Sequence, residues 1–283
     1  MAVYFSPAKI NLFLRVIGRK SFGYHEILTP MVALSFGDEV SVGVSSSDSF
    51  VCNVKEISGS SNLALKALDL FRQKTGVTTP VTISLKKRIP VGSGMGGGSS
   101  NAATVLFALN QIFSVGFSSE QLASMGAHLG SDIPFFFSLG EALCSGRGDV
   151  VTTLSEGSIE IAKRFLLVFD NRGVSSDAAY QAFSAKYSPS TENLFELAKN
   201  DLEDPVFSFR QDLCRKKKFL QETFSESQVV MSGSGATLVV FSPSRLEEKT
   251  PLIFEGSPLR YALAEKIVRE KGSWYQSNNF SYN

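Results

Sequence analysis

The chain has 283 residues, of which 43% are hydrophobic and 19% are charged, and its formal net charge at neutral pH is +1. This composition is typical of a globular protein, and the near-neutral charge gives no electrostatic reason to expect binding to nucleic acid or an anionic membrane. The length exceeds what one hydrophobic core usually supports, so we expect two domains, residues 1–155 and 156–283.

The cysteines and the N-terminal sequence indicate a cytoplasmic protein. The three cysteines are widely spaced and odd in number, which fits reduced thiols and gives no metal-binding spacing. Lys9 and Arg15 interrupt the N-terminal region, so it lacks the continuous apolar run of a signal peptide. Residues 133–144 form the most apolar segment, which is about half as long as a membrane span and contains Glu141.

Residues 3–17 alternate between apolar and polar positions and predict two strand segments that join at a kink, residues 6–8. Lys9 and Asn11 then share one face of the second segment. Such side chains on a strand are usually solvated, so the pattern alone leaves a surface role and a site role equally open.

The turn that follows, residues 18–25, carries Tyr24 and His25, which on pattern alone are more often packing or surface groups than ligands. Residues 32–54 have strand character. Residues 62–74 place apolar side chains on a broad helical face and end at Gly76, a suitable position for a helix C-terminus.

A glycine-rich loop, PVGSGMGGGSSN at residues 90–101, stands between a predicted strand and a predicted helix. Residues 81–86 alternate as a half-buried strand does, and residues 102–113 repeat at helical spacing behind Ser99, Ser100 and Asn101, which are good N-cap residues. Free N–H groups and the helix dipole make such a loop an anion site. A flexible linker is disfavoured because linkers lack such flanking patterns. The basic residues 86–88 are expected to be a solvated strand end.

Three common phosphate loops fit this segment poorly. Gly92, Gly94 and Gly97 match G-x-G-x-x-G, but the acidic residue about 20 positions on, Glu120, lies in a predicted helix and not at a strand end. A Walker A loop requires a lysine that is missing here, and the H-R-D and D-F-G motifs of protein kinases are also missing.

Beyond the loop, residues 119–129 predict a second helix, and Asp132 follows between that helix and an apolar run. From pattern alone Asp132 is a cap or turn residue. The sequence then becomes short and polar, which puts the domain boundary near Ser155. Residues 165–170 predict a buried strand, and a helix follows that carries Tyr180.

The last third of the chain predicts helices over residues 193–224, with a basic surface patch at 215–218. Residues 229–241 read as strand, Gly-Ser-Gly turn and strand, a second loop of small residues able to approach phosphates or substrate. Residues 259–271, LRYALAEKIVREK, predict a helix, and the tail beyond residue 272 allows at most a last strand.

Four stretches together resemble the GHMP kinases: the loop P-x-G-x-G-x-G-G-G-S-S-N-A-A, AKINLFLRVIGRKSFGYHEI near the N-terminus, GSDIPFFF at 130–137 and MSGSGATLVVF at 231–241. Within that family they resemble the branch that acts on 4-diphosphocytidyl-2-C-methyl-D-erythritol in the non-mevalonate isoprenoid pathway. One position departs from the pattern, because Phe22 stands where an aspartate is common, and this leaves the hydrogen bonding of that turn in question.

The resemblance implies an α+β, two-domain GHMP kinase fold with the active site in the cleft between the domains and the last strand able to return to the first domain. It implies ATP and Mg²⁺, phosphorylation of the substrate's 2-hydroxyl, and a monomer or weak dimer. Ser99 or Ser100 would reach Mg²⁺. The implied ATP-binding residues are Pro90, Val91, Gly92, Ser93, Gly94, Met95, Gly96, Gly97, Gly98, Ser99 and Ser100.

The resemblance also assigns roles to single residues. Asp132 would accept the hydroxyl proton as catalytic base, and Lys9 would steady that carboxylate and the charge that develops on the nucleophile. Asn11 would line the active site. Tyr24 and Tyr180 would stack on the two faces of cytosine, and His25 would bind its polar edge. Apart from Ser99 or Ser100, no metal ligands of the protein itself are predicted.

Three other functions stay open at this point. Another GHMP kinase that phosphorylates a different alcohol would keep the loop but has no reason to keep Tyr24 and His25. A dinucleotide-dependent reductase would use the loop for NAD(P), and a silent nucleotide-binding protein would bind ATP without turnover.

Overall fold

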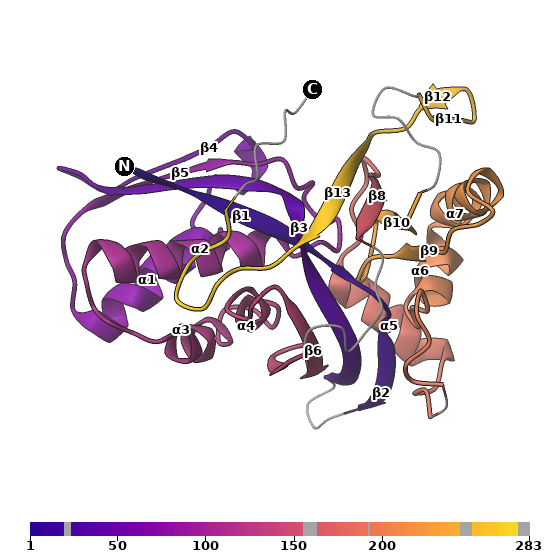
Figure 1. The fold of residues 1–283 in the computed structure, drawn as a ribbon, viewed down its shortest axis with the longest axis horizontal. Coiled ribbons are helices and arrows are strands. Elements are labelled where there is room, and N and C mark those ends of the chain that lie inside the picture. Colours follow the sequence, from indigo (N-terminus) through magenta and orange to yellow (C-terminus); the bar gives the residue numbers. More distant parts are fainter. Residues whose placement is uncertain (20–23, 155–162, 192, 244–250, 277–283) are drawn as a thin grey trace.

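The computed structural model describes residues 1–19, 24–154, 163–191, 193–243 and 251–276. It has two lobes, one with helices α1–α4 and the other with helices α5–α7, and the strands of one large sheet run between them (Figure 1). The α+β fold expected from the sequence is confirmed, while the expected boundary at Ser155 lies outside the described residues.

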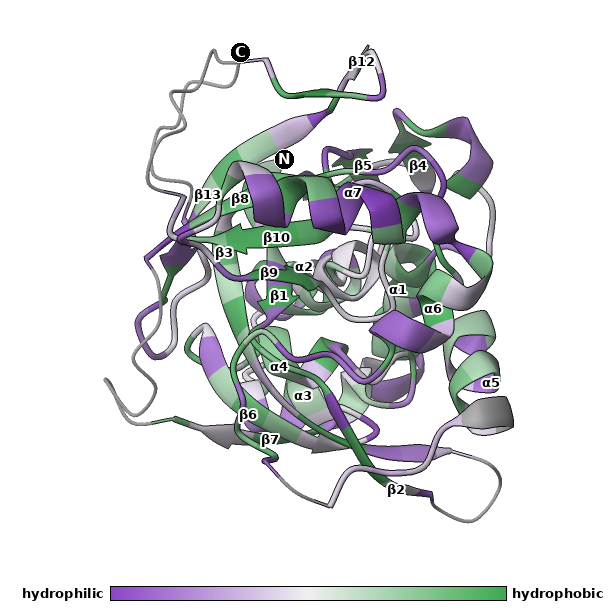
Figure 2. Ribbon diagram, turned by 90° about the vertical axis from the view of Figure 1, so that its right-hand side faces the viewer, coloured by the Kyte–Doolittle hydropathy of each residue, from purple (hydrophilic) through white to green (hydrophobic). Residues whose placement is uncertain are grey.

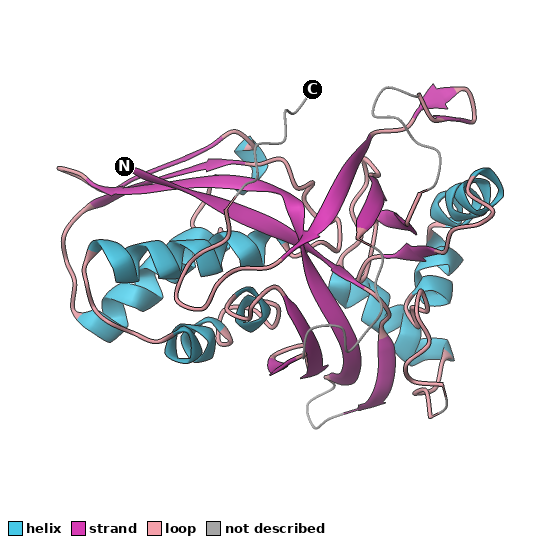
Figure 3. Ribbon diagram, in the orientation of Figure 1, coloured by secondary structure: helices cyan, strands magenta, loops and turns pink. Residues whose placement is uncertain are grey.

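Strands and helices come largely in runs of one kind along the chain, and Figure 3 shows both. The helices are α1 (Leu63–Thr75), α2 (Gly97–Ile112), α3 (Ser119–Gly126), α4 (Ile133–Phe136), α5 (Ser176–Lys186), α6 (Glu203–Phe209) and α7 (Gln211–Thr223), with a 3₁₀ turn at Lys55–Ile57. The strands are β1 (Ala2–Asn11), β2 (Arg15–Arg19), β3 (His25–Val44), β4 (Ser49–Cys52), β5 (Val81–Lys86), β6 (Glu141–Gly146), β7 (Val150–Thr153), β8 (Arg164–Val168), β9 (Val229–Met231), β10 (Leu238–Phe241), β11 (Ile253–Phe254), β12 (Ser257–Pro258) and β13 (Tyr261–Ile267).

The large sheet is organised around β3, which pairs with β1, β2, β5, β6 and β13. Its main path runs β4-β5-β3-β13-β8-β10-β9, so strands of both lobes belong to it. In the first lobe, β5 turns Val81, Ile83 and Leu85 toward α1 and α2, as the alternation predicts. The first-lobe helices α1–α4 therefore cover one face of the sheet (Figure 1).

In the second lobe, α5–α7 pack against strands β8, β9 and β10, which are buried except for Arg164 at the start of β8. Figure 2 shows α7 with many hydrophilic residues in front of the hydrophobic β10. Three residues of the N-terminal segment, Leu14, Val16 and Ile27, join this second core. β2 and the start of β3 thus pack in the second core, and β13, which pairs with β3 and β8, continues the sheet from one lobe to the other.

The segment predicted as a helix over 259–271 is instead strand β13, so that prediction is wrong. Leucine, alanine, glutamate and lysine favour a helix locally, but β13 pairs with β8 through Tyr261–Glu265 and with β3 through Lys266 and Ile267. Tertiary pairing on both sides overrides the local preference.

Two further boundaries differ from expectation. The kink predicted at residues 6–8 is a register shift between Pro7 and Lys9 inside a continuous β1, and the chain leaves the strand only after Asn11. Residues 193–202 form turns, so the predicted helical region begins at Glu203. The cysteines are free, as expected, and burial together with the charge of Asp132 raises the pKa of the Cys144 thiol to about 12. Among the described residues, no helix is long and apolar enough to cross a membrane.

Candidate active site

A cavity of about 520 Å³ lies where the two lobes meet. The first lobe lines it with β1, the glycine loop and Asp132, and the second lobe adds Tyr180 and the Gly233–Ser234 turn. Most of the predicted site residues line this cavity: Lys9, Asn11, Pro90, Val91, Gly92, Ser93, Gly94, Gly96, Gly97, Gly98, Ser99, Asp132 and Tyr180. Sequence motifs about 120 residues apart are therefore brought together by the fold.

Lys9 and Asp132 form an ion pair inside the cavity, with 3.5 Å between Lys9 Nζ and Asp132 Oδ2. The Lys9 side chain is 4% exposed and that of Asp132 is 26% exposed, so the carboxylate remains accessible to a bound molecule. Asp132 occupies the N-cap position of α4, yet its side chain accepts no capping hydrogen bond there. Asp132 therefore lies in a turn, as the pattern alone predicts, but its carboxylate does not cap the helix.

A chain of hydrogen bonds holds Lys9 from behind. Lys9 Nζ donates to Asn11 Oδ1 at 2.7 Å, and Asn11 Nδ2 donates to Thr29 Oγ1 at 2.8 Å. Thr29 in turn donates to the carbonyl oxygen of Phe13 at 2.5 Å. Lys9 and Asn11 lie on one strand face, as the alternation predicts, but that face is buried. The amide of Asn11 therefore fixes the ammonium group next to Asp132.

The glycine loop is tied to its surroundings by backbone hydrogen bonds. The carbonyl of Gly92 accepts from the N–H groups of Val174 and Ala236, and the N–H of Lys9 donates to the carbonyl of Met95 at 3.0 Å. Gly94 has a φ of 75°, and a Cβ there would lie 2.0 Å from the carbonyl oxygen of Ser232. Only glycine permits this approach, so the two small-residue loops pack directly on each other.

Helix α2 begins within the glycines and not behind the serines. Gly96 is the N-cap in a left-handed conformation, and no side chain caps the helix. The first backbone N–H groups, from Gly97 onward, are thus left for a ligand in the cavity. Ser99 lines the cavity, whereas Ser100 is fully buried and its hydroxyl bonds that of Ser6 at 2.8 Å, which removes Ser100 from the candidates for a metal contact. The side chain of Met95 is likewise buried, so only the backbone of this residue can belong to the binding site.

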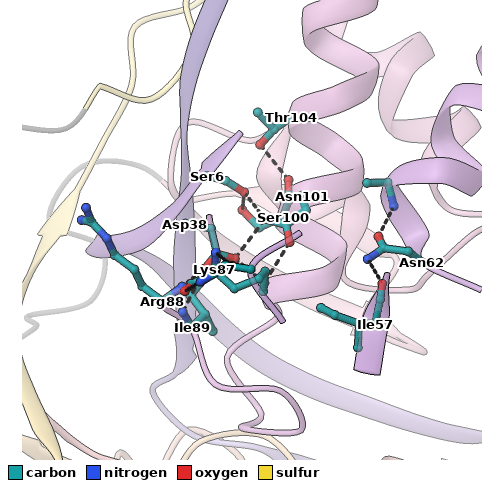
Figure 4. A network of polar contacts seen from close by, with 12 residues as sticks. Ser6, Asp38, Ile57, Asn62, Lys87, Arg88, Ile89, Ser100, Asn101 and Thr104 are labelled. Atoms are coloured by element: carbon teal, nitrogen blue, oxygen red, sulfur yellow. Dashed lines mark hydrogen bonds and ion pairs between the residues drawn. The ribbon is translucent and has the colours of Figure 1, made fainter. Parts of the chain in front are cut away.

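A buried polar network lies beside the glycine loop and is centred on Asp38 (Figure 4). Asp38 Oδ1 accepts from the backbone N–H of Arg88 at 2.7 Å and of Ile89 at 2.9 Å, and its other oxygen binds Lys87 Nζ and Asn101 Nδ2. The side chain of Lys87 is 4% exposed, so the expected solvated strand end is wrong at this residue. Sequence reasoning missed Asp38 because an acidic residue within a predicted strand carries no signal of partners far away in the chain.

The predicted cytosine-binding residues are arranged differently from one another. His25 stacks on Tyr180 with ring centroids 5.0 Å apart, and His25 Nε2 lies 2.7 Å from Ser184 Oγ. Neither His25 nor Tyr24 lines the cavity; Tyr24 is 54% exposed, with the Arg147 guanidinium 5.2 Å from its ring centroid. Phe22 lies outside the described residues, so the local hydrogen bonding of this turn stays an open expectation.

Burial shifts the pKa values of both stacked residues, His25 and Tyr180. Desolvation lowers the pKa of His25, and the positive charge of Arg19 lowers it further. Desolvation raises the pKa of Tyr180, and the negative charge of Asp132 adds to this effect. Near neutral pH both rings are therefore uncharged, which suits contact with a neutral base.

Comparisons with known proteins agree on one family. Residues 62–140 match the model of the GHMP kinases N terminal domain. The chain is 46% identical over 250 residues to the 4-diphosphocytidyl-2-C-methyl-D-erythritol kinase of Chlamydia muridarum (strain MoPn / Nigg), which covers 87% of each chain, and 43% identical over 247 residues to that of Chlamydia felis (strain Fe/C-56), covering 86% of this chain and 84% of the relative.

Solved structures give the same result at the level of the fold. A crystal structure of 4-(cytidine 5'-diphospho)-2C-methyl-D-erythritol kinase matches with a TM-score of 0.70 and 30% identity, over 85% of this chain and 90% of the other. The Methanococcus jannaschii mevalonate kinase matches with a TM-score of 0.63 and 12% identity, over 94% and 98%, which shows the shared fold alone. The chain belongs to the family of 4-diphosphocytidyl-2-C-methyl-D-erythritol kinases, a branch of the GHMP kinases.

Proposed function

We propose that the chain transfers the γ-phosphoryl group of ATP to the 2-hydroxyl of 4-diphosphocytidyl-2-C-methyl-D-erythritol, in the cytoplasm and as a monomer or weak dimer. The observation that carries this proposal is the Lys9–Asp132 ion pair in the same cavity as the open end of α2. The names of the relatives, at 46% identity, support the identity of the acceptor.

The glycine loop and the start of α2 are suited to the phosphates of ATP. The uncapped N–H groups from Gly97 onward and the positive end of the α2 dipole favour an anion. Ser93 and Gly94 are anchored to the second lobe, so the loop is already fixed before a ligand binds. Such preorganised donors are the main contribution that a protein makes to phosphoryl transfer.

Asp132 is the proposed base. Its carboxylate takes the proton of the 2-hydroxyl while that oxygen forms a bond to the γ-phosphorus, and the bond from the γ-phosphorus to the bridging oxygen of ADP breaks. Lys9, fixed by Asn11, stands 3.5 Å from the carboxylate and stabilises the negative charge on the attacking oxygen. The proton then leaves Asp132 for solvent after the product dissociates.

The residues around the cavity suit Mg²⁺ only if the phosphates of ATP supply part of its ligands. Among the described residues no three His, Cys, Asp or Glu side chains come together to hold a metal, and Mg²⁺ commonly keeps waters and phosphate oxygens as most of its ligands. Ser99 lines the cavity in the first turn of α2, and we propose its hydroxyl as the protein ligand. When bound, the ion would neutralise charge on the β- and γ-phosphates.

The second lobe and the Tyr24–His25 turn are proposed to bind the cytidine. Tyr180 offers an aromatic surface in the cavity lining, and His25, neutral and stacked on it, is proposed to bind the polar edge of the base. Tyr24 is proposed as a second stacking ring, close to Arg147 at the rim.

The decisive experiment is a coupled assay of ADP release with and without the cytidylated acceptor. We expect turnover only with the acceptor, and faster turnover with the cytidine form than with the uridine form. A protein that hydrolyses ATP equally without acceptor, or that phosphorylates free methylerythritol as well as the cytidylated form, contradicts the proposal. Phosphorylation of free methylerythritol would instead favour a GHMP kinase that acts on a smaller alcohol.

A further inference from the structure

The turn between β6 and β7 carries an arginine at the edge of the cavity, and none of the sequence motifs includes it. Arg147 stands at the tip of this turn between Gly146 and Gly148, whose φ angles are 69° and 102°. Both values suit glycine, so the two glycines allow a tight turn that presents the intervening side chain. Arg147 lines the cavity.

The guanidinium group of Arg147 is held by its neighbour Asp149. Arg147 Nε lies 3.4 Å and Nη2 3.0 Å from Asp149 Oδ2, while the backbone N–H of Arg147 donates to the other carboxylate oxygen at 3.0 Å. The Arg147 side chain is 41% exposed. Such an exposed pair contributes little to stability, but it restricts the orientation of the guanidinium.

The turn extends from the rim of the cavity to the proposed base. On one side, the Cζ atom of Arg147 lies 5.2 Å from the ring centroid of Tyr24. On the other side, a Cβ built on Gly148 would lie 3.5 Å from Asp132 Oδ1. Arg147 therefore belongs to the stretch of wall that connects Tyr24 with Asp132.

Arg147 differs from the other cationic side chains of the cavity in the place of its carboxylate partner. Of the cationic side chains in its described lining, Lys9 pairs with Asp132 and Lys87 with the buried Asp38. The carboxylate that holds Arg147 does not line this cavity, so the guanidinium is the charge that this wall presents to a ligand.

We propose that Arg147 binds the diphosphate group of the acceptor, and this inference rests on the proposed function. The acceptor consists of a base, a diphosphate and an alcohol in that order, and the protein places Tyr24 just outside the cavity, Arg147 in its wall and Asp132 farther along that wall, in the same order. A guanidinium suits phosphate oxygens because its planar N–H groups form two charge-assisted hydrogen bonds at once. Arg147 thereby fixes the distance between the base and the reacting hydroxyl.

The test compares CDP with cytidine, because only CDP carries the diphosphate. Calorimetric titrations with the ATP site saturated by a non-hydrolysable analogue would use wild type, Arg147→Gln and Arg147→Lys. We expect Arg147→Gln to weaken CDP binding on the order of 10–100-fold and to leave cytidine binding unchanged. Arg147→Lys keeps the positive charge but loses the paired N–H donors of the guanidinium. Its affinity for CDP is therefore expected to lie between those of wild type and Arg147→Gln.

The matched control is Arg164→Gln, since Arg164 is an arginine 61% exposed that pairs with Glu265 and does not line the cavity. This variant is expected to bind CDP as wild type does. An unchanged ratio of CDP to cytidine affinity in Arg147→Gln overturns the inference and leaves Arg147 as a turn residue. A wild type that binds neither CDP nor cytidine contradicts the proposed acceptor itself, a result that the Arg147 variants cannot produce.

Discussion

At the scale of single residues, the candidate site depends on a charge pair whose members differ in burial. Lys9 is almost completely buried and is fixed by Asn11, whereas Asp132 keeps about a quarter of its side chain exposed. A fixed cation next to an accessible carboxylate is a suitable arrangement for a base that must take a proton from a bound alcohol.

The first prediction concerns that carboxylate. Asp132→Asn keeps size and shape but removes the base, so we expect kcat to fall on the order of 10²–10⁴-fold with nearly normal affinity for ATP. Single-turnover kinetics measure the chemical step directly. Asp69→Asn, at an exposed position of α1, is the control and should keep wild-type rates. A loss under about threefold at Asp132, smaller than any base deletion predicts, would make it a structural turn residue.

The second prediction uses the titration of His25. Its pKa in the folded protein is lowered from 6.5, first by burial and then by Arg19, so its neutral form contributes stability above the unfolded pKa and loses it as pH falls through the folded pKa. Protonation in the same range would add a proton where the cytosine edge binds. We therefore expect KM for the cytidylated acceptor to rise as pH falls through this lowered pKa of His25.

The measurement is KM for acceptor and for ATP across pH 5–8 in wild type and His25→Ala. The rise at low pH should be missing in His25→Ala, and this variant should also narrow the difference between cytidine and uridine acceptors, because a site that pairs with a polar edge rejects analogues that leave its groups unpaired. Tyr24→Ala, which removes stacking of about 1–3 kcal/mol, should raise KM without narrowing that difference. Equal pH profiles for the two proteins would contradict the role of His25.

At the scale of elements, the start of α2 determines what the glycine loop can bind. The three glycines at 96–98 are not equivalent. A Cβ on Gly97 would lie 3.0 Å from Ile89 Cγ2 and 3.1 Å from Lys87 Nζ, so a side chain there would disturb the core and the buried network. A Cβ on Gly98 would meet only Leu63 Cδ1 at 3.4 Å, an ordinary contact.

This difference gives the third prediction. Gly98→Val should fill part of the cavity beside the first turn of α2 and weaken a non-hydrolysable ATP analogue strongly, while thermal unfolding changes little. Gly97→Val should weaken the same analogue but also lower the melting temperature, because it crowds buried side chains. Titration calorimetry and a melting curve for each variant separate the two effects. A Gly98→Val protein with wild-type affinity would contradict phosphate binding at this loop.

The elements also show where sequence reasoning succeeds. Strand β5 and helix α2 follow from a period of two and from helical spacing; β5 has its buried face as predicted, while α2 begins earlier than predicted and is buried on nearly all sides. Helix α1 ends at Gly76 in the left-handed conformation that the sequence indicates. These features depend on local chemistry, which a sequence displays directly.

The missed features depend on partners far away in the chain. Strand β13 has helix-forming residues and becomes a strand only because β3 and β8 pair with it. Lys87 looks solvated until Asp38 is found 49 positions earlier in the chain. The long motifs locate Lys9, Asp132 and the loop, yet the distances among them, and Arg147 beside them, follow only from the folded chain.

At the scale of the whole molecule, the two lobes share one sheet. Strand β13 pairs with β3 of the first lobe and β8 of the second, and the chain then returns to the first lobe. There Trp274 is 6% exposed, stacks on Phe107 at 4.7 Å and donates its indole N–H to the carbonyl of Phe5 at 2.9 Å. We propose from this continuity that residues 1–155 and 156–283 unfold together, whatever their boundary.

The fourth prediction tests that cooperativity with Trp274, the sole tryptophan of the chain. Its fluorescence reports on the first lobe, whereas far-UV circular dichroism reports on the helices of both lobes. Because a shared sheet couples the lobes, we expect the two signals to follow one urea transition with the same midpoint. Trp274→Ala should lower the free energy of unfolding by about 3–5 kcal/mol and move the single dichroism transition as a whole, with Trp274→Phe losing less. The contrary result is a dichroism curve with two steps, of which only one coincides with the fluorescence transition in wild type, or only one moves in Trp274→Ala. It would mean that the lobes unfold independently and that β13 joins them without coupling their unfolding.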